Sequence, residues 1–185
     1  QIVKTANIEG NTIAIPISKA FSVQSKILGN AEILDAVNHN NLKVNILWTT
    51  NPSLISNISL TNTSPIALAD ITSTNINVKI APNQSGNAVV TLHNGSITNP
   101  IYWSWHIWVT NSEITNIVYD SAQPITGATN YINYTKFGGA LETEFMDRNL
   151  GAEEAFPTVM TPANPTADEL SKIKISGGLQ YQWGR

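Results

Sequence analysis

The 185-residue chain contains no cysteine, and only 12% of its residues are charged. Without cysteine it can form neither disulfide bonds nor thiolate metal sites. The charged fraction is far below the average of about 25% for globular domains. Asparagine, serine and threonine therefore supply most of the polar surface, a composition that is frequent in secreted β-rich proteins.

Two further absences bear on membranes and nucleic acids. No apolar run approaches the length of about 20 residues that crosses a bilayer as a helix, and no charged-then-apolar targeting segment begins the chain. The net charge of −3 provides no basic stripe, so we expect no nucleic-acid binding. The chain starts at Gln1 instead of methionine, which predicts processing, an upstream segment or an incomplete sequence.

Hydrophobic residues make up 42% of the chain, enough for a packed core, and in the first 110 residues they fall into short segments. Strands are predicted at residues 12–17, 42–48, 55–61, 76–80, 88–93 and 101–110. Turn signals occur at Asn51-Pro52, 83–87 and Asn94-Gly95. This regular spacing predicts an Ig-like antiparallel β-sandwich over residues 1–110.

Two of these strands alternate clearly between apolar and polar residues. In 42–48 the side chains of Leu42, Val44, Ile46 and Trp48 are predicted to face inward, and 76–80 alternates in the same way. Segment 31–37 could form a helical turn, but polar residues follow at once, and we interpret it as a loop or strand.

The segment 102–108 holds three of the five tryptophans of the chain. In a strand, alternate residues face opposite sides of the sheet. This places Trp103, Trp105, Ile107 and Val109 on a core face, and Tyr102, Ser104, His106 and Trp108 on the other face. Packing is the favoured interpretation, but Tyr102, His106 and Trp108 are the candidate ligand-binding residues.

From Asn111 onward strands become harder to place, while glycine, proline and acidic residues increase. Thr166-Ala167-Asp168-Glu169 is a capping-box pattern and predicts a short helix over residues 167–172. Gly177-Gly178 and a strand-like segment at 179–183 follow.

No motif assigns a catalytic site. His39, His93 and His106 lie far apart without carboxylates at metal-ligand spacing, so we expect no metal and favour a packed over a catalytic His106. The acidic residues Glu142, Glu144, Asp147, Glu153 and Glu154 could bind calcium, but their spacing favours a solvated loop. Asp147 could instead pair with Arg148. With no phosphate loop, nucleophile elbow or carboxylate pair, neither enzyme activity nor a cofactor is expected.

Four segments carry a family resemblance: 85–90, 101–110, Met146 to Ala152 and Gly178 to Arg185. Together, from about Asn11 onward, they resemble a region of large secreted and cell-surface proteins of Bacteroidetes bacteria. The last two segments are similar to the Fibrobacter succinogenes major paralogous domain, in which a Met-x-x-Asn-Leu element precedes a Gly-Leu-x-Tyr-x-Trp element.

This resemblance implies that residues 111–185 are the opening part of a C-type-lectin-like, mixed α/β segment. Such modules normally continue beyond the position of Arg185, which implies a longer polypeptide. The related formylglycine-generating enzymes use cysteines that are missing here, so their activity is not implied. Asp120-Ser121-Ala122 matches the O-glycosylation pattern of exported Bacteroidetes proteins, and an ordinary exposed turn explains it equally well.

The leading functional hypothesis is a non-enzymatic module, secreted or on the bacterial cell surface or outer-membrane exterior. It would serve as an adhesin or envelope-assembly component whose partners are other envelope proteins or glycans. In the sharper version, Tyr102, His106 and Trp108 stack on sugars. The alternatives are a purely structural spacer or assembly subunit, and a fragment of a secreted hydrolase.

Overall fold

The computed structural model describes residues 2–29, 42–62, 66, 68–119, 143–155 and 165–179. The chain forms two compact units, Gln1–Ser112 and Glu113–Arg185. Segment 31–37, residues 180–183 of the predicted last strand, and Asp120-Ser121-Ala122 lie outside the described residues.

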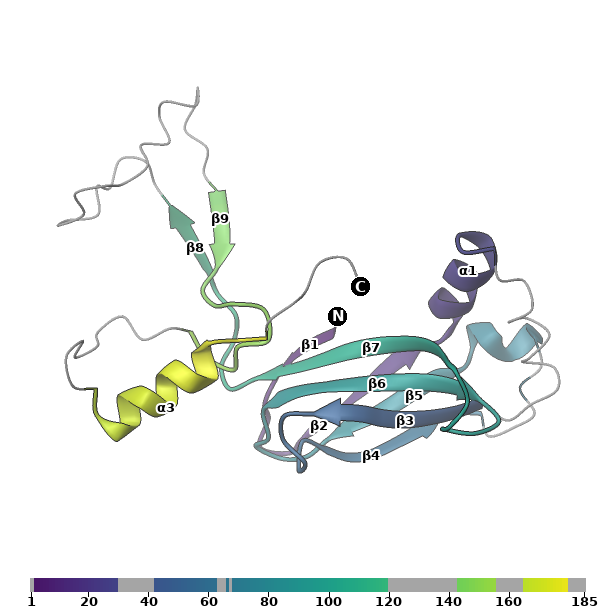
Figure 1. The fold of residues 1–185 in the computed structure, drawn as a ribbon, viewed down its shortest axis with the longest axis horizontal. Helices are drawn as coiled ribbons and strands as arrows, with labels where there is room; N and C mark the ends of the chain where they lie inside the picture. Colours follow the sequence, from purple (N-terminus) through teal and green to yellow (C-terminus); the bar gives the residue numbers. More distant parts are fainter. Residues whose placement is uncertain are drawn as a thin grey trace, which may run out of the picture. The chain divides into compact units, whose positions relative to one another are not determined.

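The first unit contains two β-sheets (Figure 1). Sheet A has the strand order β1-β7-β6-β3, and sheet B has the order β2-β5-β4. The strands of sheet A are β1 (Ile2–Thr5), β7 (Ile101–Thr110), β6 (Gly86–Asn94) and β3 (Leu42–Thr49). Those of sheet B are β2 (Asn11–Pro16), β5 (Asn75–Ile80) and β4 (Ile55–Leu60). All neighbours pair antiparallel except β1 and β7, which are parallel.

The expectation of a mainly β chain is therefore confirmed. Each of the six predicted segments is a strand, with its ends moved by at most two residues. Strand β1 was not predicted, since four residues between polar neighbours give too short a pattern to detect.

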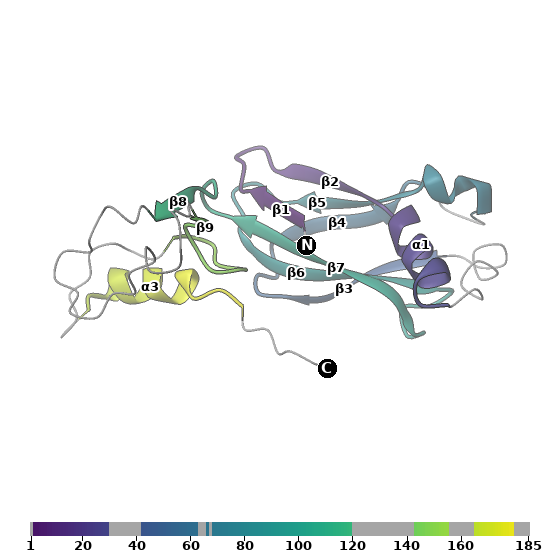
Figure 2. The same cartoon turned by 90° about the horizontal axis from the view of Figure 1, so that it is seen from above.

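The two sheets form two layers that share one core (Figure 2). Alternation creates this core: in β5, Ile76, Val78 and Ile80 are buried while Lys79 between them is exposed. Sheet A contributes residues such as Val90 and Ile107 to the same cluster. Residues from both sheets thus leave water together, which is what holds the layers against each other.

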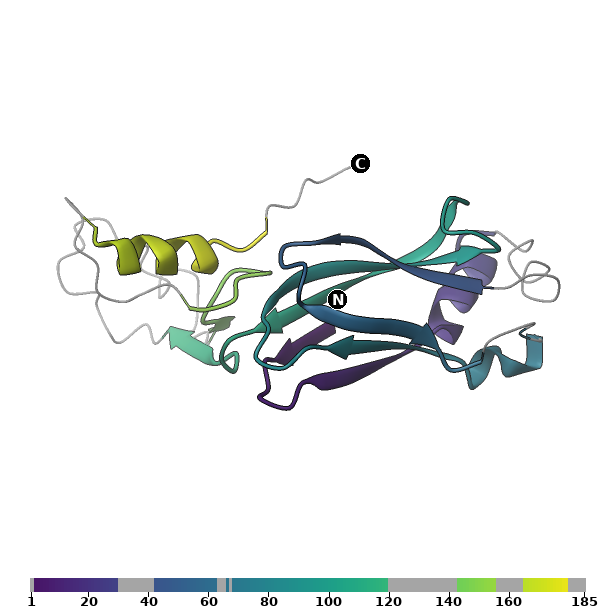
Figure 3. The ribbon, with the colours of Figure 1, turned by 90° about the horizontal axis from the view of Figure 1, so that it is seen from below.

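A helix, α1 (Ser18–Lys26), lies at one end of the two sheets, near the short 3₁₀ helix η1 (Leu68–Thr72) (Figures 1 and 3). Helix α1 was not predicted from the sequence. Its N-cap, Ile17, makes no side-chain capping hydrogen bond, and its first turn has no acidic residue, so the usual start signals are missing. Burial of Ala20 and Phe21 stabilises it instead.

In the second unit, β8 (Asn116–Tyr119) pairs antiparallel with β9 (Thr143–Met146), and α3 (Ala167–Ser176) follows. The predicted capping box is confirmed, because the Thr166 hydroxyl accepts from the Glu169 amide at 3.3 Å while the Glu169 carboxylate accepts from the Thr166 amide at 2.7 Å. The helix runs beyond the predicted end at Lys172, to Ser176. None of the helices that the structure describes is long and apolar enough to cross a membrane.

Candidate functional site

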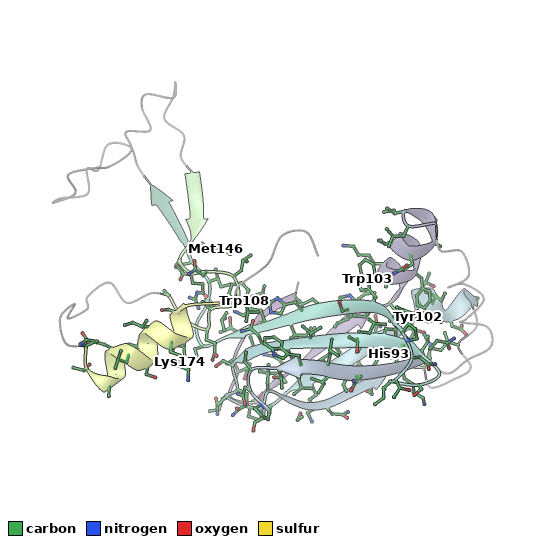
Figure 4. All side chains as sticks on the ribbon, in the orientation of Figure 1. His93, Tyr102, Trp103, Trp108, Met146 and Lys174 are labelled. Carbon is green, nitrogen blue, oxygen red and sulfur yellow. The ribbon has the colours of Figure 1, made fainter. Side chains whose placement is uncertain are left out.

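The aromatic strand β7 lies inside sheet A, between β1 and β6 (Figure 4). Ile107 and Val109 belong to the shared core, and Trp105 packs against it while partly buried, as their alternation predicts. Trp103 is half-buried. One face of β7 is therefore committed to holding the two sheets together.

The position of Tyr102 differs from the prediction. Leu92 pairs with Trp103, and the next residue of β6, His93, pairs with Ile101, so Tyr102 is the extra residue of a β-bulge. A bulge breaks the alternation of faces, and Tyr102 packs against the core instead of pointing to the outer face. Burial raises the pKa of its phenol. Its backbone oxygen accepts from Gln24 of α1 at 2.8 Å, so this bulge also fastens the helix to the strand.

Trp108, the second candidate, is only 1% exposed. Its cross-strand partners are Asn87 on β6 and Val3 on β1. An indole with so little exposed surface has no face on which a ligand could stack. Its burial supplies packing energy instead.

His106, the third candidate, is half-buried. Its Nε2 lies 2.9 Å from Oδ1 of Asn87, a residue that is itself 2% exposed. The amide oxygen can only accept, so Nε2 carries the proton in this arrangement. Burial lowers the pKa of the His106 imidazole below the ordinary histidine value, which favours a neutral ring at neutral pH.

We therefore expect His106 to titrate below the ordinary histidine pKa of 6.5 in NMR spectra of its ring protons. Since the folded chain disfavours the charged ring, the unfolded chain takes up this proton first. The contribution of the neutral His106 ring to folding stability is then fully present above about pH 6.5, and it is lost as the pH falls through the lowered pKa. His106→Gln should lack this pH-dependent step. An unshifted His106 pKa would contradict the burial argument.

One exposed aromatic residue of this face was not predicted from the sequence. Trp48 was predicted to face inward, but the pairing of β3 with β6 shifts between Ile46 and Trp48, which makes Leu47 a bulge residue. Trp48 then pairs with Val89, whose neighbours Ala88 and Val90 point into the core. Trp48 therefore lies on the outer face of sheet A and is 41% exposed. No local sequence signal marks this bulge.

Trp48, Val89 and His106 form a continuous cross-strand row, because Val89 pairs with Trp48 on one side and with His106 on the other. We call these three residues the outer row. Directly opposed residues of neighbouring strands have Cβ atoms about 5 Å apart. The outer row thus combines an exposed indole, an aliphatic side chain and a neutral imidazole on one surface.

His93 is held by protein groups on both ring nitrogens. His93 is buried, with Nε2 2.8 Å from the Thr91 hydroxyl and Nδ1 2.8 Å from the backbone oxygen of Asn99. It fastens the β6–β7 turn to the sheet. His39 lies outside the described residues. In the described ranges no three His, Asp or Glu residues gather in a way that could hold a metal ion.

In the second unit, the predicted pair of Asp147 with Arg148 is confirmed. Arg148 Nε donates to Asp147 Oδ1 at 2.7 Å and Nη2 donates to Oδ2 at 2.9 Å, a bidentate arrangement. The guanidinium also donates to the backbone oxygens of Glu113 at 2.7 Å and Glu153 at 3.0 Å. Together with the Thr115 hydroxyl, this bonding lowers the pKa of Asp147 to about 2.

The acidic residues considered above as calcium ligands can be placed in part. Asp147 is engaged by Arg148 and Thr115, while Glu153 and Glu154 are half-buried. Glu142 and the side chain of Glu144 lie outside the described part of the chain. Asp147 therefore fixes a turn, as a paired carboxylate does.

Two of the segments that carry the family resemblance contact each other in this unit. The Leu179 amide donates to the Leu150 oxygen at 2.9 Å, and a Cβ on Gly178 would lie 2.6 Å from that same oxygen. The residue that follows Ala152 also bonds to α3, since the Glu153 amide donates to the Ile175 oxygen at 2.9 Å. Gly178 has a φ of 73°, so its backbone conformation favours glycine, and the close Leu150 oxygen leaves no room for a Cβ.

Comparisons with protein-family models, curated proteins and solved structures gave no match.

Proposed function

We propose that the chain is a non-enzymatic module of a secreted or cell-surface bacterial protein, an adhesin or envelope-assembly component, in which the tryptophan strand is structural. One observation carries this proposal: Tyr102, His106 and Trp108 do not form an exposed row. Tyr102 packs on the core, Trp108 is buried, and His106 is bonded to Asn87. Strand β7 is thus built as a scaffold.

The strand order supports an Ig-like sandwich for the first unit. Strands β7-β6-β3 and β2-β5-β4 follow the arrangement of the G-F-C and B-E-D strands of immunoglobulin domains. For the second unit, the contact of Leu179 with Leu150 supports the lectin-like resemblance, because it joins the two segments on which that resemblance rests.

The low charge of the chain supports the surface location. Asparagine, serine and threonine supply most of its polar side chains, the composition expected of secreted β-rich proteins. The proposed partners are envelope proteins or glycans, and the chain would be one part of a longer polypeptide. A hydrolase role lacks comparable support, because the hydrogen bonds of Asp147 and His106 engage each of them within its own unit.

Labelling of intact cells of the source organism tests this proposal. Antibodies against the folded chain should label intact cells as strongly as permeabilised cells. An antibody against a cytosolic protein serves as the control and should label only permeabilised cells. Labelling of the chain that requires permeabilisation would contradict the surface role.

A further inference from the structure

The outer row is placed on the surface by a specific feature of the backbone. Regular alternation from Leu42 would turn Trp48 into the core, and the bulge at Leu47 turns it outward. Bulges re-aim side chains and are frequent beside binding sites. The consequence is an indole left 41% exposed, next to the half-buried Val89 and His106.

Polar side chains without formal charge lie next to the outer row on the same face. The next cross-strand row of the same face joins Asn45, Thr91 and Ser104. With a rise of about 3.3 Å per residue, it lies about 7 Å from the outer row. On the other side, Asn87 bonds to His106. Among the residues of these rows none carries a formal charge while the His106 ring is neutral, and burial lowers the pKa of that ring.

This combination selects the chemistry of a ligand. Flat aromatic rings attract the apolar C–H face of a sugar ring, and nearby amides and hydroxyls can bond to its hydroxyl groups. A charged ligand would lose its hydration without gaining an opposite charge in these rows. An added β-strand is disfavoured, because β3 ends sheet A with both a bulge and the exposed Lys43, two features that block edge pairing.

We propose that the outer row is a glycan-binding site, in which a neutral pyranose ring stacks on Trp48 beside Val89 and His106 while its hydroxyl groups reach the row of Asn45 and Ser104. This inference deepens the proposed function and rests on it, since it names the ligand class of the surface module. It moves the binding role from the predicted residues Tyr102 and Trp108 to Trp48 and retains His106.

The test is an NMR titration of the whole chain with cellohexaose, xylohexaose and mannohexaose, three neutral oligosaccharides. At least one should shift the indole N–H signal of Trp48 and the ring signals of His106. Trp48→Ala should weaken the binding of that oligosaccharide about tenfold. Trp48→Phe, which keeps a flat ring, should retain most of the affinity.

Ile97→Ala is the matched control, because Ile97 is an apolar residue outside the outer row and is 52% exposed. It should bind like the wild type, and both alanine variants should keep the wild-type spectrum elsewhere. Three results would each overturn the inference: no shift at Trp48 with any of the three sugars, unchanged affinity in Trp48→Ala, or equal binding of charged oligogalacturonate.

A protein partner at the same surface is distinguished by sedimentation. If the wild type self-associates and Trp48→Ala does not, the outer row is an interface between copies and the glycan assignment is wrong. Failure of sugar binding alone removes only the ligand assignment. The surface location is tested independently by labelling of intact cells.

Discussion

Trp108→Ala should lower the free energy of unfolding by about 3 to 5 kcal/mol, the usual cost of emptying a large buried aromatic site. Trp108 is 1% exposed and stands between Asn87 and Val3 on the neighbouring strands. Its removal would leave a cavity beside the buried Asn87. The measurement is hydrogen exchange of the amides of β6 and β7, which reports on this sheet separately from the second unit.

Trp103→Ala and Trp48→Ala are the controls for this prediction. Both remove the same indole, but Trp103 is half-buried and Trp48 is 41% exposed. We expect the loss of stability to follow burial, with Trp108 largest and Trp48 smallest. If Trp103→Ala destabilised the sheet more than Trp108→Ala, the assignment of Trp108 as the structural tryptophan would be wrong.

Arg148→Met should destabilise the second unit by about 3 kcal/mol, because it leaves a carboxylate in place without its partner. The Arg148 side chain is 1% exposed and that of Asp147 is 10% exposed. The substitution keeps the aliphatic stem but removes the guanidinium, which donates to Asp147 and to the backbone oxygens of Glu113 and Glu153. Hydrogen exchange of the α3 amides measures the effect.

Lys172→Met is the matched control in the same unit. Lys172 forms a 2.8 Å ion pair with Asp168 on α3, but both side chains are largely exposed. Exposed pairs of this kind add little to stability, so we expect no measurable loss. A similar loss in both variants would show that net charge, not the buried arrangement, sets the stability of this unit.

The pH dependence provides a second measurement on Arg148→Met. The pKa of Asp147 is lowered to about 2 in the folded chain. The ionised carboxylate therefore stabilises the unit above its unfolded pKa near 4, and this contribution is lost as the pH falls through about 2. Arg148→Met should lose less stability over this range than the wild type, since its Asp147 no longer has the guanidinium that lowers the pKa.

Much of the fold could be predicted because its signals are local. Alternation along β5 shows which side chains enter the core, and the hydroxyl and carboxylate of Thr166 and Glu169 cap α3 within a single turn. Asp147 and Arg148 are sequence neighbours, so their pairing could also be predicted. In each case the interacting groups lie a few residues apart.

The candidate site was harder to predict, because its geometry depends on contacts between segments that lie far apart in the sequence. The faces of Tyr102 and Trp48 depend on bulges that exist only relative to β6. Helix α1 forms without capping signals because Phe21 is buried. The backbone acceptors of Arg148 at Glu113 and Glu153 come from turns that the fold brings together.

The sequence by itself determined a cysteine-free, weakly charged, mainly β chain with an aromatic strand, since composition and alternation decide which surfaces can leave water. The tertiary structure alone decided which aromatic residues are accessible. A shift of one residue in strand pairing reverses the face of every side chain that follows it. For this reason Tyr102 joins the core and Trp48 is exposed beside His106. Trp108 keeps its predicted face, and only tertiary packing decides that it is buried.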